Sequence, residues 1–221
     1  MSLKRCPLST NEFYHVYNKA IADEKIFSDL EYLHRILQTV DFYRYNQRIR
    51  LSQFNKSAKP LQYNYLKEVS SSIPLVEIFA FSFMPNHYHF LVKQLQENGV
   101  RKFISNTENS FAKYFDLKKN RKGSLFLNSF KYRRITSREE FIHLCRYIHL
   151  NPVTSCLIEF KELATYPFCS FSCYLNTNRN KFIKTDYMFN HFRSRNNFIK
   201  FHEDQVDYQR KLRKIKKSLI D

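Results

Sequence analysis

The feature that most constrains the fold is a pair of apolar, aromatic-rich runs joined through the dipeptide Pro85-Asn86. Residues 75–83 and 87–93 are rich in aromatic and branched side chains, a composition typical of β-strands. Because only a short turn separates the two runs, they predict a β-hairpin and therefore an antiparallel sheet.

Further strands and helices are predicted on both sides of this hairpin. Residues 13–17 and 132–135 have strand character, whereas apolar side chains recur at helical spacing over 30–42 and 99–119. Ser28 with Glu31, and Ser137 with Glu140, are spaced as capping boxes that open helices, and Pro152 is expected to end the second of these. The order is strand, helix, strand, strand, helix, strand, helix. It predicts an α+β fold: a ferredoxin-like βαββαβ antiparallel sheet with helices on one face, plus a further helix and a C-terminal helical extension.

The domain organisation is predicted from changes in composition along the chain. Residues 1–175 are expected to form one domain, with an exposed polar insertion at about 48–72. Residues 176–221 are expected to form a basic, aromatic C-terminal extension.

Two histidines at the start of the second hairpin strand indicate a site. Residues i and i+2 of a strand point to the same face, so His87 and His89 should project side by side. Two imidazoles in that arrangement are a ready pair of metal ligands. The alternative is a structural or solvent-facing pair, which is the commoner use of such a motif.

The charge and composition favour a folded protein with a polyanionic partner. The net charge is +17, from 37 Lys and Arg against 20 Asp and Glu, which favours nucleic acid first and an anionic membrane surface second. Part of that charge can instead reflect an overall bias towards Lys, Asn, Ile, Phe and Tyr. With only Gly99 and Gly123, a glycine-rich phosphate loop is excluded.

The cysteines and the hydropathy pattern bear on location. Five irregularly spaced cysteines and the absence of a signal peptide point to free thiols in a reducing cytoplasm. No apolar run reaches the roughly 18 residues that a membrane span needs, so no membrane partner is expected.

Several motifs, in a fixed order, resemble the HUH single-strand DNA nucleases, and most of all the REP-associated tyrosine transposases. The resemblance covers roughly residues 13–174. It rests on the segments Tyr14-His15-Val16-Tyr17-Asn18, Met84-Pro85-Asn86-His87-Tyr88-His89, Gly123-Ser124-Leu125-Phe126, Tyr147-Ile148-His149-Leu150-Asn151-Pro152-Val153 and Tyr166-Pro167.

The resemblance implies a DNA transposase that cleaves and rejoins single-stranded DNA through a 5′-phosphotyrosine. It implies Tyr147 as the nucleophile and His87, His89 and Asn151 as ligands of a divalent ion, Mg²⁺ or Mn²⁺. The helical spacing agrees, because Tyr147 and Asn151 are four residues apart and share a helix face. The implied partner is single-stranded DNA with hairpin elements, bound by a monomer or a homodimer. Predicted DNA-binding residues are Arg101, Lys102, Lys113, Arg133 and Arg134, with a basic tail at Arg210–Lys217.

Other functions fit parts of the same pattern. The chain could be a domesticated or inactive single-stranded nucleic-acid-binding protein on the same scaffold, in the manner of RNA-recognition domains. It could also be a metal-dependent phosphodiesterase that uses water as the nucleophile. Tyr114, Tyr132 and Tyr166 are rivals of Tyr147, His15 is expected to pack or contact substrate, and His149 is expected at the surface.

Overall fold

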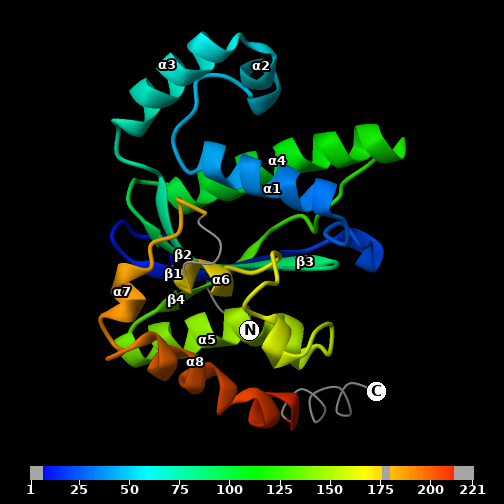
Figure 1. Cartoon of the computed structure of the whole chain (residues 1–221). Coiled ribbons are helices and arrows are strands. Elements are labelled where there is room, and N and C mark those ends of the chain that lie inside the picture. Colours follow the sequence, from blue (N-terminus) through cyan, green and yellow to red (C-terminus); the bar gives the residue numbers. More distant parts are fainter. Residues whose placement is uncertain (1–6, 176–179, 212–221) are drawn as a thin grey trace.

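A four-stranded antiparallel sheet forms the centre of the molecule (Figure 1). The computed structural model describes residues 7–175 and 180–211. Within them the strand order is β2-β3-β1-β4, the order of a ferredoxin-like βαββαβ unit. The strands are β1 (Phe13–Lys19), β2 (Val76–Met84), β3 (His87–Gln94) and β4 (Lys131–Ile135). The predicted fold class and hairpin are confirmed.

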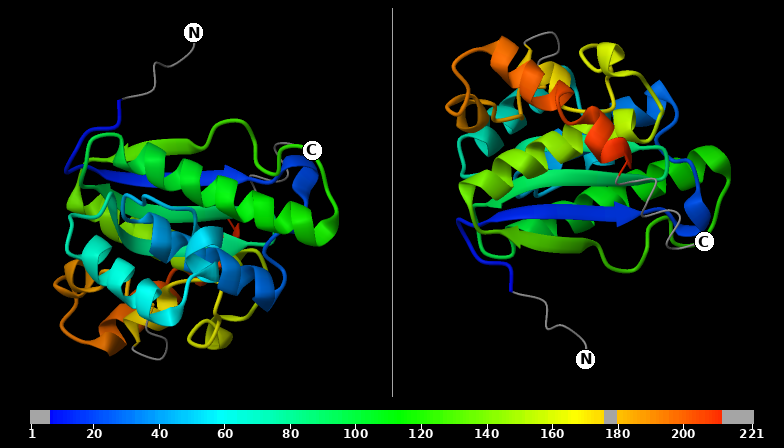
Figure 2. Two further views of the ribbon diagram at one scale, coloured as in Figure 1. Left: turned by 90° about the horizontal axis from the view of Figure 1, so that it is seen from above. Right: turned by 90° about the horizontal axis from the view of Figure 1, so that it is seen from below.

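Helices cover both faces of this sheet (Figures 1 and 2). The two helices of the βαββαβ unit lie together on one face, as predicted: α1 (Leu30–Tyr43) and α4 (Gly99–Lys119). The opposite face carries α5 (Arg138–Thr154) and the C-terminal helices that follow it. These later elements are η2 (Phe160–Glu162), α6 (Phe171–Tyr174), α7 (Asp186–Phe189) and α8 (Arg195–Glu203).

The sheet is not covered evenly on the α5 side. Seen from below in Figure 2, α5 lies over the β2–β3 half, and β1 and β4 are visible beside it. Strand β2 is accordingly buried over nearly its whole length, whereas β4 alternates between exposed and half-buried residues before it reaches buried Ile135. This leaves β1 and β4 as the more accessible half of that face.

The helix starts follow local side-chain chemistry, with one correction. Ser137 caps α5 as predicted, since its Oγ accepts a hydrogen bond from the Glu140 N–H at 3.1 Å. For α1 the capping prediction was wrong: Asp29, and not Ser28, accepts from the Glu31 N–H, at 2.7 Å. Asp is as good an N-cap as Ser, so the sequence pattern alone did not separate the two positions.

The polar segment at about 48–72 is helical. It forms α2 (Leu51–Lys56) and α3 (Lys59–Ser70), which extend from the α1 and α4 layer (Figure 1). Most of its side chains are exposed, as predicted, and a few aromatic ones hold it in place. The Phe54 ring lies 5.2 Å from Phe42 of α1 and 5.9 Å from Tyr65 of α3.

The C-terminal residues contribute to the same hydrophobic core as the sheet. Phe182, Met188 and Phe198 are buried within it. The Phe198 ring stacks on Tyr174 of α6 at 5.2 Å and on Phe171 at 5.5 Å. A domain division at residue 175 stays a prediction, but these contacts mean that the extension stabilises the α5 side of the sheet.

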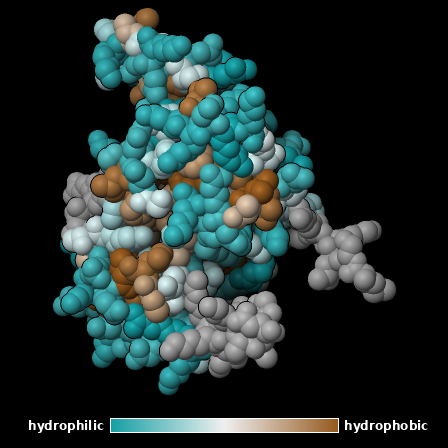
Figure 3. All heavy atoms as spheres, turned by 90° about the vertical axis from the view of Figure 1, so that its right-hand side faces the viewer, coloured by the Kyte–Doolittle hydropathy of each residue, from teal (hydrophilic) through white to brown (hydrophobic). Residues whose placement is uncertain are grey.

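The surface and the thiols can be described for the residues that the structure covers. Among the described helices, none is long and apolar enough to cross a membrane. The face drawn in Figure 3 is mainly hydrophilic, with small separate hydrophobic patches. The described cysteines Cys145, Cys156, Cys169 and Cys173 are free thiols, and Cys6 lies outside the described residues.

Gly99, the first residue of α4, lies against the backbone of Leu75, the residue before β2, and leaves no room there for a side chain. A Cβ at this position would lie 2.4 Å from the backbone carbonyl oxygen of Leu75, which cannot swing aside as a side chain can. We therefore expect Gly99→Ala to lower the free energy of unfolding by about 1–3 kcal/mol, the usual cost of overpacking. Denaturant unfolding measures this. Ser105→Ala is the control, because Ser105 lies exposed on the same helix. Equal stability of the two variants would contradict the prediction.

Candidate active site

The two predicted metal-ligand histidines lie side by side on β3. Their ring centroids are 5.1 Å apart and the rings are nearly perpendicular. His89 is buried and His87 is half-buried. Both project from the sheet face that α5 partly covers, because β3 begins directly after the Pro85-Asn86 turn and residues i and i+2 share a face.

A third histidine from the neighbouring strand contacts this pair. His15 of β1 has its Nε2 3.0 Å from Nδ1 of His89, and the two rings stack at 5.2 Å. Burial first, and the nearby positive charge of Arg133 second, lower the pKa of His15 to about 4. A neutral His15 can share one hydrogen bond with His89 and so fix the orientation of its ring.

His87 is oriented by a separate chain of contacts. Its Nδ1 lies 2.6 Å from Oδ1 of Asn86, and the Asn86 amide donates to Asp23 at 2.5 Å. Asp23 in turn pairs with Lys19 at 2.5 Å, and the hydrogen bond from Lys19 is the main cause that holds the Asp23 pKa below its usual value. An amide oxygen facing Nδ1 favours the tautomer in which Nε2 is the ligating atom, a common arrangement around metal-binding histidines.

Helix α5 brings the predicted nucleophile against the histidines. The Tyr147 ring centroid lies 5.8 Å from that of His89 and 6.2 Å from that of His15, in both cases edge-on. Tyr147 is 42% exposed, so a substrate can reach it from solvent. The site therefore joins a strand hairpin, a neighbouring strand and a helix that are distant in sequence.

Asn151 lies one helical turn after Tyr147 and is 4% exposed. Its side-chain Nδ2 is buried and has no hydrogen-bond partner among the described residues. Leaving a buried N–H donor unpaired is costly, so this NH2 group is suited to an acceptor from outside the protein, such as a phosphate oxygen, whereas a metal ion would bind Oδ1. Two imidazoles and an amide form a neutral donor set that a hard divalent ion can use when phosphate oxygens complete its coordination.

The cluster contains few of the commonest metal ligands. Within residues 7–175 and 180–211, no group of three or more His, Cys, Asp or Glu side chains is placed to hold a metal ion. For a site made by His87 and His89, the family resemblance implies Asn151 as the third ligand.

The predicted DNA-binding residues do not form one surface. Arg101 and Lys102 lie exposed at the start of α4, and Arg101 lines a polar pocket of about 520 Å³. Lys113 lies three turns further along the helix and lines a different pocket. Arg210 pairs with Glu159 at 3.1 Å, and residues 212–217 of the predicted basic tail lie outside the described residues.

Arg133 and Arg134 of β4 are both engaged within the protein. Arg133 forms an ion pair with Glu140, and Arg134 forms one with Glu12. In the sheet register, Arg133 lies opposite His15. Opposed residues of antiparallel strands share a face, so Arg133 adds positive charge next to the histidine cluster even while Glu140 partly compensates it.

The prediction for His149 was wrong. It is fully buried, with Nε2 3.0 Å from Oγ of Ser170 and Nδ1 3.1 Å from Nε2 of His202. It was expected at the surface because it lies two residues beyond Tyr147 and so on another side of the helix. That side is covered by α6 and α8, which sequence spacing could not show.

The family comparison agrees with the motif resemblance. Residues 44–151, a little under half of the chain, match the family described as "Transposase IS200 like". That segment contains His87, His89, Tyr147 and Asn151. The predicted resemblance to these transposases is confirmed. No curated protein sequence matches the chain.

Two solved structures are similar to much of the chain. A REP-associated tyrosine transposase bound to a REP hairpin matches with a TM-score of 0.50 and 16% identity, covering 83% of this chain and 89% of its own. A candidate transposase of Deinococcus radiodurans matches with a TM-score of 0.37 and 13% identity, covering 66% and 95%. The first of these supports the fold.

Proposed function

We propose that this chain, with its IS200-like transposase segment, is a DNA transposase that cleaves and rejoins single-stranded DNA. One observation carries the proposal: within the matching segment, the half-exposed Tyr147 lies edge-on to the buried His89. Tyr147 therefore lies beside His89, one of the two proposed metal ligands, and beside His15. A metal-assisted tyrosine nucleophile needs such a position next to the ion.

In the proposed reaction the Tyr147 hydroxyl oxygen attacks the phosphorus of a backbone phosphate. The phenol gives up its proton to solvent as the new 5′-phosphotyrosine bond forms, the bond from phosphorus to the 3′ oxygen breaks, and that oxygen takes up a proton from solvent and leaves as a 3′-hydroxyl. The phosphodiester energy is kept in the tyrosine linkage, so the reverse attack by a 3′-hydroxyl can join a new strand.

His87, His89 and Asn151 would hold Mg²⁺ or Mn²⁺, which supplies positive charge to the scissile phosphate and to the attacking oxygen. A phenol normally ionises only at a pH of about 10, so such a charge is needed at neutral pH. His15 contacts Nδ1 of His89, and Asn86 contacts Nδ1 of His87. Both therefore act as positioning residues for the proposed ligands.

The proposed substrate is a single strand flanked by a hairpin. This rests on the resemblance and on the similar transposase whose structure holds a REP hairpin. The charge of +17 suits such a polyanion.

A covalent adduct tests the proposal. Incubation with a labelled hairpin-flanked single strand in Mg²⁺ or Mn²⁺ should give a protein–DNA adduct that survives denaturing electrophoresis, and EDTA should abolish it. We expect His87→Ala and His89→Ala each to lower the rate by about 100- to 1,000-fold, the range for losing one electrostatic contribution to a transition state.

The control is His34→Ala, an exposed histidine of α1 on the far side of the sheet. It should leave the rate unchanged. Cleavage without any adduct would instead support a phosphodiesterase with a water nucleophile. Binding without cleavage would support the domesticated binding protein. Adduct formation in EDTA would refute the metal role alone.

A further inference from the structure

One aromatic side chain beside the proposed active site has no part in the reaction described above. Tyr17 of β1 lies directly opposite His89 in the sheet register, and the two ring centroids are 5.7 Å apart. The Tyr147 ring is equally near to His89, at 5.8 Å, but it comes from α5. Tyr17 is half-buried and lies on the sheet surface next to the place proposed for the scissile phosphate.

The Tyr17 ring belongs to a group of three rings with similar inclinations. Its centroid lies 4.9 Å from that of His15, and its plane is tilted by 32° from the planes of both His15 and His89. The two imidazoles are inclined to each other by 24°. Tyr147, in contrast, meets them edge-on, at 77° and 82°. Because flat rings attract one another in offset stacks, a further flat group such as a nucleobase can extend this series.

Positive charge lies next to Tyr17 on the same face of the sheet. Lys131 of β4 is directly opposite Tyr17 in the sheet register, and Arg133 follows two residues later on the same face. Arg133 pairs with Glu140. Lys131 is exposed and, within residues 7–175 and 180–211, forms no ion pair. Proteins that bind single strands combine such a ring, which stacks a base, with cations that neutralise the backbone.

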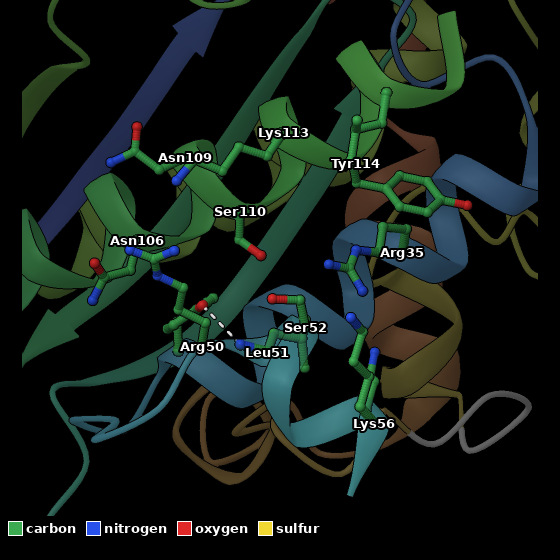
Figure 4. A pocket seen from close by; sticks show the side chains of 13 residues that line it. Arg35, Arg50, Leu51, Ser52, Lys56, Asn106, Asn109, Ser110, Lys113 and Tyr114 are labelled. Carbon is green, nitrogen blue, oxygen red and sulfur yellow. Dashed lines mark hydrogen bonds between the residues drawn. The ribbon is translucent and has the colours of Figure 1, made fainter.

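The sheet surface that carries Tyr17 and Lys131 is open to a strand. Helix α5 covers the β2–β3 half of this face, and β1 and β4 are visible beside it in Figure 2. A second group of cations, which includes Arg35, Arg50 and Lys113, lines a groove between α1, α2 and α4 on the other face of the sheet (Figures 1 and 4). The sheet separates that groove from Tyr147, so a nucleotide next to the cleaved bond meets Tyr17 and Lys131 instead.

We propose that Tyr17 is a stacking platform for the nucleobase that adjoins the scissile phosphate, and that Lys131 contacts the next phosphate. This inference rests on the proposed cleavage of single-stranded DNA. The four-stranded sheets of RNA-recognition domains stack unpaired bases on strand aromatics in a similar way. Every base has a π-face, so the platform accepts any base. Its role is to hold the strand in register, so that one particular phosphate lies at Tyr147.

The test combines Tyr17→Leu with abasic sites in the DNA. Leucine keeps an apolar side chain on β1 but has no ring face. A hairpin-flanked single strand is made with one abasic nucleotide at each unpaired position in turn. Its affinity is measured by fluorescence anisotropy in Mg²⁺, in a Tyr147→Phe background so that no cleavage occurs. On the intact strand Tyr17→Leu should weaken binding by about 5- to 150-fold, the loss of one base–aromatic stack. At one abasic position the two proteins should bind equally, because the base that stacks is already absent.

Further variants separate the ring from its surroundings. Tyr17→Phe retains the ring and should bind DNA as the parent protein does. Lys131→Ala should lower the salt slope of the affinity by about 0.7, the value for one single-strand phosphate, and an unchanged slope would overturn this contact. The matched controls are Tyr208→Leu and Lys59→Ala, which remove an exposed ring and an exposed cation elsewhere. Both should leave the affinity and its salt slope unchanged.

The outcomes distinguish this platform from the catalytic proposal. Equal weakening by Tyr17→Leu on the intact strand and on every abasic strand would overturn the platform, because the ring would then only support the neighbouring histidines. Unchanged affinity in Tyr17→Leu would overturn it as well. Loss of the effect at one abasic position, in a protein whose wild type forms no adduct, would support the platform and refute the catalytic proposal. An adduct in the wild type without any such position would refute the platform alone.

Discussion

Tyr147→Phe is expected to abolish the covalent protein–DNA adduct and leave DNA binding intact. Phenylalanine keeps the ring that packs edge-on to His89 and His15, and it keeps the exposed position on α5. Only the hydroxyl oxygen is removed, and without it the phosphotyrosine bond cannot form. The rate of strand cleavage should therefore fall by about 10⁴-fold or more, as for loss of a catalytic nucleophile.

The rival tyrosines provide the controls for this experiment. The Tyr114 hydroxyl donates to Glu31, and the Tyr132 ring packs 6.0 Å from that of Tyr14. Burial raises the pKa of Tyr166 to about 12. Phenylalanine at each of these three positions should leave adduct formation within a few-fold of the wild type. An adduct that persists in Tyr147→Phe and disappears in Tyr114→Phe would show that the assignment is wrong. Anisotropy with the same oligonucleotide would establish that binding is retained.

Acidification below pH 6.5 is expected to destabilise the fold through two buried histidines. His202 Nδ1 donates to the Phe198 carbonyl at 2.8 Å, so its Nε2 accepts from Nδ1 of His149 when both rings are neutral. His149 Nε2 then accepts from Ser170. A proton added to His202 would place two N–H donors against each other inside the core.

The sign of the pH effect follows from the pKa shifts. Burial lowers the pKa of His202 from 6.5 to about 3, and burial with the adjacent His202 lowers that of His149 well below 6.5. Between pH 6.5 and these lowered values the unfolded chain binds more protons than the folded one, so stability is complete above pH 6.5 and falls as the pH drops. At pH 4.5 His202 alone lowers the free energy of unfolding by about 3 kcal/mol relative to its value above pH 6.5.

Denaturant unfolding followed by circular dichroism from pH 7.5 to 4.5 measures this dependence. His202→Gln should unfold more easily at pH 7.5, because His149 loses its partner, but its stability should change less with pH. His34→Ala should keep the full pH dependence, since His34 is exposed. A wild-type protein that is as stable at pH 4.5 as at pH 7.5 would contradict the expectation.

Features that depend on neighbouring residues could be predicted from the sequence. The β2–β3 hairpin, the bounds of α4 and the Ser137 cap follow from strand composition, helical periodicity and a local hydrogen bond. The shared strand face of His87 and His89 follows from the period of two. The motif order also identified the transposase resemblance, which the family match over residues 44–151 confirms.

Features that join distant segments were decided only by the tertiary structure. His15 and His89 are 74 residues apart and meet because β1 pairs with β3. His149 is buried because α6 and α8 cover its side of α5, and the exposed insertion supplies α2 to a groove that Lys113 completes. Periodicity states which face of an element is apolar or polar, but not which other element packs on it. That choice depends on burial and charge summed over the whole fold, and it is what placed the cationic groove between α1, α2 and α4 and the Tyr147 cluster on opposite sides of one sheet.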